Sequence, residues 1–584
     1  MNIVKFEFVC SRPVPLYAHL CNHYLTSKQV DITVSFTDNC YLIEASGEQA
    51  QLEQLADDIA ERFLVSAWLV DSSITLIEQR LGSKTPLPVE PMALAFCQEC
   101  MPRFGDNQHA DFANIALPCP HCQGEKRLNS DTLAASASDL RAMAKHLITH
   151  GKLTLGKDIV LSLKPSSVTA RPSLLVCNPN TINAQFHLND RQVLALSSIE
   201  KPYITARAIE RHPSLDLPLY DLCFANSRIL VIIAELLRQQ GIDWVYIIEP
   251  QRPAPMAYIN GAWVSVNQGN PNSDLSPLSI TSSLDALHEN SLISHGGYVY
   301  RGQHHQQRYQ VSVEQQPKPL ETQNLGDIEM GRCAFNSVLI EHQIEKHAAM
   351  VFFSEHHGGQ IQTLDGKKQQ QLFFTLPKLP QSGYEIFHQL EQSPQQTVLL
   401  KFKQQFPHDY LRLLDLKLPD NRQNLRCLHA VAALILGIET PQLSVDQLSD
   451  ALVANALAHR GSNAPRVDFT LTRGEAHRSL NWCRMLGSLM SFRLADDTPN
   501  CQQRLAFGIH DSFADYLANW IEHLDQNVGV KAVALLGDEW QNSALTQRVQ
   551  LRVGKNFKII TNQRLDIDGN NYAIGALRLN KRRL

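Results

Sequence analysis

The sequence predicts a multidomain α/β protein, and three observations support this prediction. The chain has 584 residues, which at typical domain sizes corresponds to roughly three to five domains. Apolar residues recur with strand and helix periods along most of the chain. Proline-rich segments at 85–91 and 315–319 separate the patterned regions, so we expect domain boundaries there.

Composition excludes several classes of protein. Hydrophobic residues make up 44% and charged residues 19% of the chain, as in soluble globular proteins. The net charge of −5 argues against a broad nucleic-acid-binding surface. We see no secretory signal and no long apolar run, and we expect a cytoplasmic protein without a membrane span. In that compartment the 13 cysteines predict free thiols and a metal site, and not a disulfide framework.

The first 85 residues predict a small domain with the order β-α-β-β-α-β, which is the ferredoxin-like pattern. Its expected elements are a strand at 4–9, a helix at 16–25, strands at 32–36 and 41–45, a helix at 50–63 and a strand at 73–78.

Later segments alternate between the two periods. We expect a helix at 138–150 that leads into an α/β region ending near residue 320. Beyond residue 325 we expect strands at 350–353, 398–402 and 532–536, and helices at 428–436 and 513–524.

Four cysteines form two C-x2-C pairs with an 18-residue spacer: Cys97, Cys100, Cys119 and Cys122. Two such turns supply the tetrahedral sulfur set that Zn²⁺ favours. Surface thiols or a redox pair are the alternatives, and the second pair at this spacing disfavours them. A four-sulfur site is coordinatively closed, so we expect a structural zinc ion. His121 is a bystander or takes the place of one cysteine.

Four cysteines at this spacing behind a ferredoxin-like domain resemble the HypF family, the carbamoyltransferases that mature [NiFe] hydrogenases. The resemblance implies an acylphosphatase-like domain at 1–85 and a zinc finger at 92–128. It further implies a YrdC-like α/β domain at 130–320 and a two-lobed ASKHA-type carbamoyltransferase domain at 325–584. The second zinc finger of the family is missing here.

The segment Val9-Cys10-Ser11-Arg12-Pro13 resembles the phosphate-cradling loop of the family's acylphosphatase domain. Arg12 matches the anion-binding arginine, but the glycines of the cradle are absent, and Ser35 stands near the family's asparagine. We therefore expect no carbamoyl phosphate hydrolysis. The alternative for Arg12 is a solvated surface arginine.

In the YrdC-like region, Arg171-Pro172 and Lys201-Pro202 resemble framework strands of the family. The family's phosphate-binding segments are not recognisable. Glu249 lies near the expected phosphate loop, where a carboxylate would repel a phosphate.

The C-terminal region resembles the family at several motifs. Ser354 to Gly359 is similar to S-x-H-x-G-D, and 425–431 is similar to the metal-binding H-H-H-A-H, of which only His429 remains, with Cys427 and Val431 at the outer positions. Asp568 is similar to the metal-binding aspartate of D-G-G. Arg12, His429 and Asp568 are thus the catalytic candidates. The alternatives are a satisfied helix histidine for His429 and a plain Asp-Gly turn for Asp568.

Residues 535–542 resemble the family's L-S-G-G-V-F-Q-N turn, which approaches nucleotide phosphates. Gly537 and Asn542 are the cofactor-binding candidates. Asp538 and Glu539 place two carboxylates at that turn, and Phe335 stands where the family has a lysine. We therefore do not expect tight binding of ATP with Mg²⁺.

Taken together, the motifs predict a HypF-like protein of [NiFe] hydrogenase maturation that is catalytically degenerate. It would bind zinc and act as a scaffold or accessory factor for a HypE-like maturation protein or a hydrogenase subunit. One alternative is an active ATP-dependent carbamoyltransferase that supplies the carbamoyl group for cyanide ligand synthesis. Another is an RNA-binding YrdC-type protein, which the acidic balance disfavours.

Overall fold

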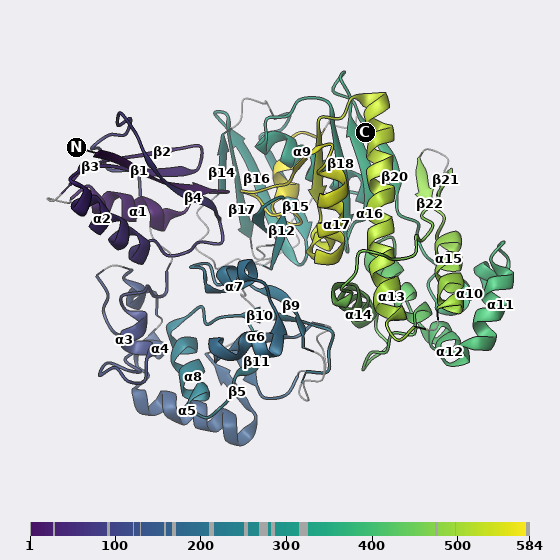
Figure 1. Ribbon diagram of the computed structural model, residues 1–584, viewed down its shortest axis with the longest axis horizontal. Coiled ribbons are helices and arrows are strands. Elements are labelled where there is room, and N and C mark those ends of the chain that lie inside the picture. The colour runs from purple at the N-terminus through teal and green to yellow at the C-terminus, as the bar shows by residue number, and fades with distance from the viewer. Residues whose placement is uncertain are drawn as a thin grey trace.

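The computed structural model forms a mixed α/β assembly of several packed bodies (Figure 1). It describes residues 2–26, 30–89, 94–120, 122–128, 130–156, 159–165, 171–209, 215–249, 255–267, 278–281, 286–314, 325–473, 477–496 and 498–579. His121 and the segment 315–319 lie outside these residues. Within them, no helix combines the length and the apolar composition that a bilayer crossing requires.

The N-terminal body has the order β-α-β-β-α-β and one four-stranded sheet ordered β2-β3-β1-β4. The sheet order and the packing of both helices on one face are those of a ferredoxin-like fold. Asp38 and Asn39 take positive φ in the turn between β2 and β3, as tight hairpins require. The bounds are β1 Asn2–Cys10, α1 Pro15–Tyr24, β2 Asp31–Thr37, β3 Cys40–Gly47, α2 Gln49–Arg62 and β4 Leu69–Leu76.

The cysteine-bearing segment packs on a second body that contains a seven-stranded sheet ordered β5-β6-β11-β7-β10-β9-β8. One face of this sheet shares a core with the N-terminal body, and the other face shares a core with the cysteine segment. The helices are α3 Met101–Gly105, α4 Ser130–Leu133, α5 Ala137–His150, α6 Ile182–Gln185, α7 Asp190–Ser197 and α8 Arg228–Arg238. The strands are β5 Lys152–Leu155, β6 Ile159–Ser162, β7 Ser173–Val176, β8 Phe186–His187, β9 Ile204–Ala208, β10 Leu219–Cys223 and β11 Trp244–Ile248.

Strands β12 to β17 pack with the C-terminal body, although we expected a boundary near residue 320. Their buried side chains join the C-terminal core, and β15, β16 and β17 contact α18. The bounds are β12 Met256–Ile259, β13 Ala262–Ser265, β14 Leu278–Thr281, β15 Asn290–His295, β16 Tyr298–His305 and β17 Arg308–Glu314.

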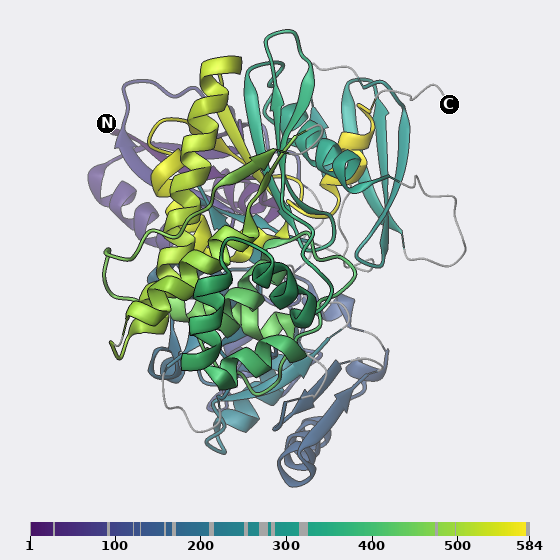
Figure 2. The same cartoon turned by 90° about the vertical axis from the view of Figure 1, so that its right-hand side faces the viewer.

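The rest of the C-terminal body is built on a second seven-stranded sheet, ordered β21-β22-β20-β19-β18-β23-β24. Helices α9 and α18 pack together between this sheet and the β14–β17 sheet, and the long helix α16 runs beside the second sheet (Figures 1 and 2). The strands are β18 Ala348–Ser354, β19 Gly358–Leu364, β20 Gln370–Thr375, β21 Leu471–Arg473, β22 Arg478–Leu480, β23 Ala532–Leu536 and β24 Lys558–Ile560. The helices are α9 Asp327–Glu341, α10 Gly383–Glu391, α11 Gln396–Gln405, α12 Pro407–Asp415, α13 Leu425–Ile435, α14 Val445–Ala458, α15 Trp482–Ala495, α16 Cys501–Val528, α17 Ser543–Val553 and α18 Asn571–Ala576.

One expected element is wrong. The strand predicted at 398–402 lies inside helix α11. Its buried side chains, Leu399 and Phe402, are three residues apart, which is helical and not strand spacing. Leu400 is exposed, whereas Val398 is partly buried against the core.

Candidate functional sites

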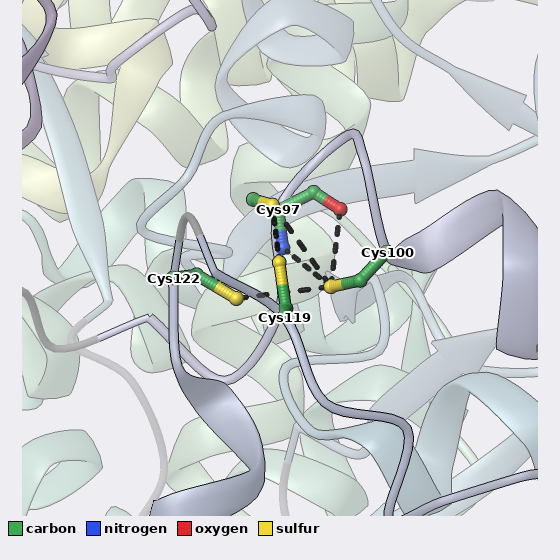
Figure 3. Close-up of side chains that lie close together, drawn as sticks. All are labelled: Cys97, Cys100, Cys119 and Cys122. Atoms are coloured by element: carbon green, nitrogen blue, oxygen red, sulfur yellow. Dashed lines mark hydrogen bonds between the residues drawn. The ribbon is translucent and has the colours of Figure 1, made fainter. Parts of the chain in front are cut away.

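The four cysteines predicted to bind zinc lie together and are buried. Figure 3 shows their sulfur atoms pointing toward one another. The Sγ atom of Cys97 lies 3.9 Å from that of Cys100 and 3.7 Å from that of Cys119. The Sγ atoms of Cys100 and Cys122 are 3.7 Å apart. A tetrahedral ion with Zn–S bonds of about 2.3 Å would separate its sulfurs by roughly 3.8 Å. The cluster therefore has the size and donor chemistry to hold a metal ion.

Local backbone geometry explains how the second pair of cysteines closes. Gln123 adopts a left-handed conformation with φ of 51°, which turns the chain directly after Cys122. At Gly124 a Cβ atom would come within 2.0 Å of the Ala95 carbonyl oxygen. Only glycine permits this approach, and it brings the second C-x2-C turn against the segment that leads into the first.

Arg12 is not the solvated surface arginine that we considered, because only 5% of it is exposed. Its guanidinium carbon lies 3.8 Å above the ring of Trp68. Among the described residues its Nε and Nη2 have no hydrogen-bond partner. Burial lowers the pKa of Arg12 to about 10, although Asp566, Glu341 and Glu200 oppose this effect.

The loop around Arg12 offers few main-chain donors to an anion. The N–H groups of Ser11 and Val14 donate within the domain, at 2.8 Å to a main-chain carbonyl and at 3.0 Å to a tyrosine hydroxyl. Pro13 and Pro15 have no N–H group. A phosphate cradle depends on several free N–H groups that converge on one point, and this loop lacks that arrangement.

The N-terminal body is instead docked on the rest of the chain at this edge. Glu200 accepts hydrogen bonds from the Ser66 hydroxyl at 2.6 Å and from the Ala67 N–H at 2.8 Å. Arg564, in the C-terminal body, donates to Asn39 at 2.9 Å. Arg12 is therefore enclosed where the bodies meet.

A cavity of about 1060 Å³ lies between the second body, which contains β5 to β11, and the C-terminal body. Its lining on the first side includes Arg191, Arg207 and Asp221, and on the second side it includes the candidates His429 and Asp568. The candidate Asn542 also lines this cavity. Charges of both signs line each wall, since Asp221 lies with the arginines of the first side and Arg426 with the carboxylates of the second.

Asp538 and Glu539 line the cavity, but their carboxylates are already engaged with the main chain. Glu539 accepts hydrogen bonds from the N–H groups of Leu425 at 3.1 Å and Arg426 at 2.7 Å, at the start of α13. Asp538 accepts from the Glu355 N–H at 2.8 Å. Burial raises the pKa of Glu539 to about 7 and raises the pKa of Asp538 well above its usual value. These side chains thus occupy donors that an anionic ligand would otherwise use.

Gly537 and Asn542 have structural roles in this turn. Gly537 has φ of 101°, and a Cβ atom there would lie 2.0 Å from the Phe353 carbonyl oxygen. Its N–H donates to Ile567 at 2.9 Å. Asn542 caps helix α17 through the Leu545 N–H.

His429 faces the cavity, and it is not the satisfied helix histidine that we considered. Among the described residues its ring makes no hydrogen bond, and its nearest aromatic neighbour is His510, at 5.0 Å between ring centroids. Burial lowers the pKa of His429 well below its ordinary value, and His510 and Arg426 add to this effect. Cys427 and Val431 are fully buried core residues, so this helix brings one neutral imidazole to the cavity.

Asp568 is held by two side chains that sequence reasoning missed. Its Oδ2 lies 2.9 Å from His295 Nε2, and its Oδ1 accepts from the Tyr572 hydroxyl. His295 Nδ1 in turn lies 3.0 Å from His357 Nε2, and His357 approaches Asp327 at 3.5 Å. Asp568 is therefore more than the plain Asp-Gly turn that we considered.

This series of interacting side chains runs from the buried cavity wall to the surface. The side chains of Asp568 and His295 are 2% and 1% exposed, whereas the Asp327 side chain is 59% exposed. Burial would raise the pKa of Asp568, but His295 outweighs burial and lowers it to about 2. Burial would lower the pKa of His295, but Asp568 outweighs it and the pKa is raised. Both shifts show that the buried Asp568 and His295 each stabilise the charged form of the other.

Comparison with known proteins finds a family-model match within the C-terminal body and one partial relative. Residues 426–575 match the family model described as "Carbamoyltransferase, Kae1-like Domain, second subdomain". A 230-residue stretch is 26% identical to Protein HydE of Wolinella succinogenes. This stretch is 38% of the chain and 40% of HydE, so the alignment spans less than half of that relative.

Solved structures match the chain from end to end. The structure of T. kodakarensis HypF is 12% identical with a TM-score of 0.63, over 99% of this chain and 98% of that one. A full-length HypF in the phosphate- and nucleotide-bound form is 10% identical with a TM-score of 0.58, over 99% of this chain and 97% of that one. The fold of the chain is thus that of HypF. The family-model match covers 426–575, and the likeness over the whole chain is one of fold.

Proposed function

We propose that this protein acts in [NiFe] hydrogenase maturation as a zinc-binding accessory or scaffold protein that does not use ATP for carbamoyl transfer. The observation that carries the proposal is the contact between Glu539 and α13. The N-terminus of a helix attracts anions through its free N–H groups and its dipole. Here an internal carboxylate takes the N–H groups of Leu425 and Arg426.

Three further observations support the loss of family chemistry. Both oxygens of Asp568 are engaged by His295 and Tyr572, and the four cysteines are the only group of three or more potential metal ligands found among the described residues. The loop of Arg12 lacks the free N–H groups of a phosphate cradle. One HypF structure that this fold matches is described as phosphate- and nucleotide-bound. In this chain the loop of Arg12, in the N-terminal body, and the turn of Glu539, in the C-terminal body, both lack free N–H groups for such anions.

The zinc assignment follows from the donor set. Four thiolates at tetrahedral separations suit Zn²⁺ and leave no open position for a substrate. The four residues lie in the interior of the cysteine segment, where the ion would join two loops. We propose that the ion is structural and that the protein works in the cytoplasm, where thiols stay reduced.

Calorimetry with ATP and Mg²⁺ on the full chain tests the proposal. We expect no binding by the wild type below about millimolar concentrations, and tighter binding by Glu539→Ala, which frees the start of α13. An exposed carboxylate variant, Glu391→Ala, is the control for a general change in charge. Micromolar binding by the wild type that weakens on Asp568→Ala would instead support the active ATP-dependent carbamoyltransferase.

The partner is tested separately. A HypE-like maturation protein or a hydrogenase subunit should co-sediment with the purified chain in the absence of ATP. A complex that forms only with ATP would contradict the accessory role, because nucleotide binding would then control the interaction. Absence of a complex under both conditions would also contradict it.

A further inference from the structure

A buried arginine from a neighbouring helix reaches the four-cysteine cluster. Arg228 is the first residue of α8 and is 0% exposed. Its Nη2 lies 3.9 Å from Cys100 Sγ and 3.6 Å from the Glu125 carboxylate. Its guanidinium carbon lies 5.2 Å from the centre of the Phe104 ring. The sequence gives no sign of this contact, since Arg228 is 128 residues from Cys100.

The other donors of Arg228 join the two cysteine turns. Its Nε donates to the Ala95 carbonyl at 2.9 Å, and its Nη1 donates to Leu117 at 2.6 Å and Ile115 at 3.0 Å. Ala95 and Leu117 each stand two residues before the first cysteine of a C-x2-C pair. One guanidinium therefore fixes both chain segments that lead into the cluster.

Charge gives this contact a second effect. Four thiolates around a divalent ion carry a net charge of −2, and a buried charge is costly unless cations or hydrogen-bond donors compensate it. The guanidinium of Arg228 brings a cationic donor group to the cluster. Among the described residues, Arg228 is the cationic side chain that contacts a cysteine of the cluster, through Cys100 Sγ.

We propose that Arg228 is an outer-sphere positioning residue of the metal centre, through which metal occupancy stabilises the start of α8 in the neighbouring body. This inference rests on the proposed zinc ion. The ion would hold the two cysteine turns in place, the turns would present the carbonyls of Ala95 and Leu117, and these carbonyls would hold Arg228. Loss of the metal should therefore loosen the start of α8, and loss of the guanidinium should weaken metal binding.

Metal release from the purified full chain tests the role of Arg228. Zinc is measured by elemental analysis, and its transfer to a chromogenic chelator is then followed in time. Arg228→Met keeps most of the side-chain length and removes the charge. We expect zinc affinity to fall by about 10–100-fold, as for other outer-sphere partners, with faster release. Arg228→Lys should recover only part of the loss, because an ammonium cannot reach three carbonyls in the planar guanidinium geometry.

Arg238→Met is the matched control, because Arg238 ends the same helix and is partly exposed, with Glu235 as its partner. It should release zinc like the wild type. A wild type without zinc would refute the proposed zinc ion itself. A wild type with one zinc, and an Arg228→Met variant that releases it at the wild-type rate, would refute only the role of Arg228.

A measurement on the wild type alone covers the case in which Arg228→Met fails to fold. Hydrogen exchange is recorded before and after removal of zinc by a chelator. We expect faster exchange at the start of α8 as well as in residues 94–128. Faster exchange confined to 94–128 would overturn the proposed coupling.

Discussion

Arg171 and Asp450 form a two-point ion pair between the second body, which contains β5 to β11, and helix α14 of the C-terminal body. The Nε–Oδ2 distance is 2.9 Å and the Nη2–Oδ1 distance is 2.5 Å. Both side chains are largely buried, and Arg171 also donates to Thr205. The arginine that resembles a framework residue of the family thus joins two bodies at the edge of the cavity.

Removal of one partner from this pair should loosen the contact between the bodies. Arg171→Met leaves the Asp450 carboxylate buried without its cation, and breaking a buried pair costs about 3–5 kcal/mol. We expect a lower unfolding midpoint in denaturant and faster cleavage by proteases. The double variant Arg171→Met with Asp450→Leu should recover part of the loss. Additive losses in the double variant would contradict a direct interaction.

Metal analysis should give close to one zinc per chain. Cys119→Ser removes one thiolate from the closed set, so we expect less zinc and a lower melting temperature. Cys483→Ser is the control, since Cys483 lies far along the chain on α15. A fully folded wild type without metal would show that the cluster is a set of free thiols.

The full chain should not hydrolyse acetyl phosphate or carbamoyl phosphate above background. The loop of Arg12 offers too few free N–H groups to stabilise a phosphoryl group. Arg12→Ala should leave this background unchanged. Turnover by the wild type that disappears in Arg12→Ala would demonstrate a working acylphosphatase site.

The His295–Asp568 pair should make stability depend on pH. The raised pKa of His295 contributes stability that is complete below its unfolded value, about 6.5, and is lost as the pH rises through the folded pKa. The lowered pKa of Asp568 contributes stability above about 3.8, which is lost as the pH falls toward about 2. His295→Gln should therefore lower the melting temperature most between about pH 4 and 6.5.

Melting curves of the wild type and His295→Gln at pH 5.5 and 9 check this prediction. The gap between the two proteins should shrink at the higher pH, since the wild-type imidazolium deprotonates there. His305→Gln, at the tip of the β16–β17 hairpin, is the control. An equal gap at both values would mean that His295 contributes through packing alone.

Local pattern predicted the parts of the fold whose signals are local. The N-terminal order of elements followed from the periodicity of its apolar residues. The cysteine spacing predicted the cluster because the two pairs each form a short turn. Helix α11 was missed because a short apolar run fits both periods.

The cavity was beyond such reasoning because its contacts are long-range. His295 and Asp568 are 273 residues apart, and nothing near His295 marks it as a partner of a buried carboxylate. The same limit applies to Glu539. From the sequence we expected its carboxylate to repel a ligand. In the fold the carboxylate accepts hydrogen bonds from the first N–H groups of α13.

The docking of the N-terminal body has a consequence for biosynthesis. Asn39 emerges from the ribosome 525 residues before Arg564, the residue that donates to it. The ferredoxin-like domain has its own sheet and can fold early, since domains generally fold as units during synthesis. Its buried face around Arg12 must then wait in water until Arg564 has been translated. Closure of that face therefore reports that translation has passed Arg564, and chains truncated before this residue would carry the face open.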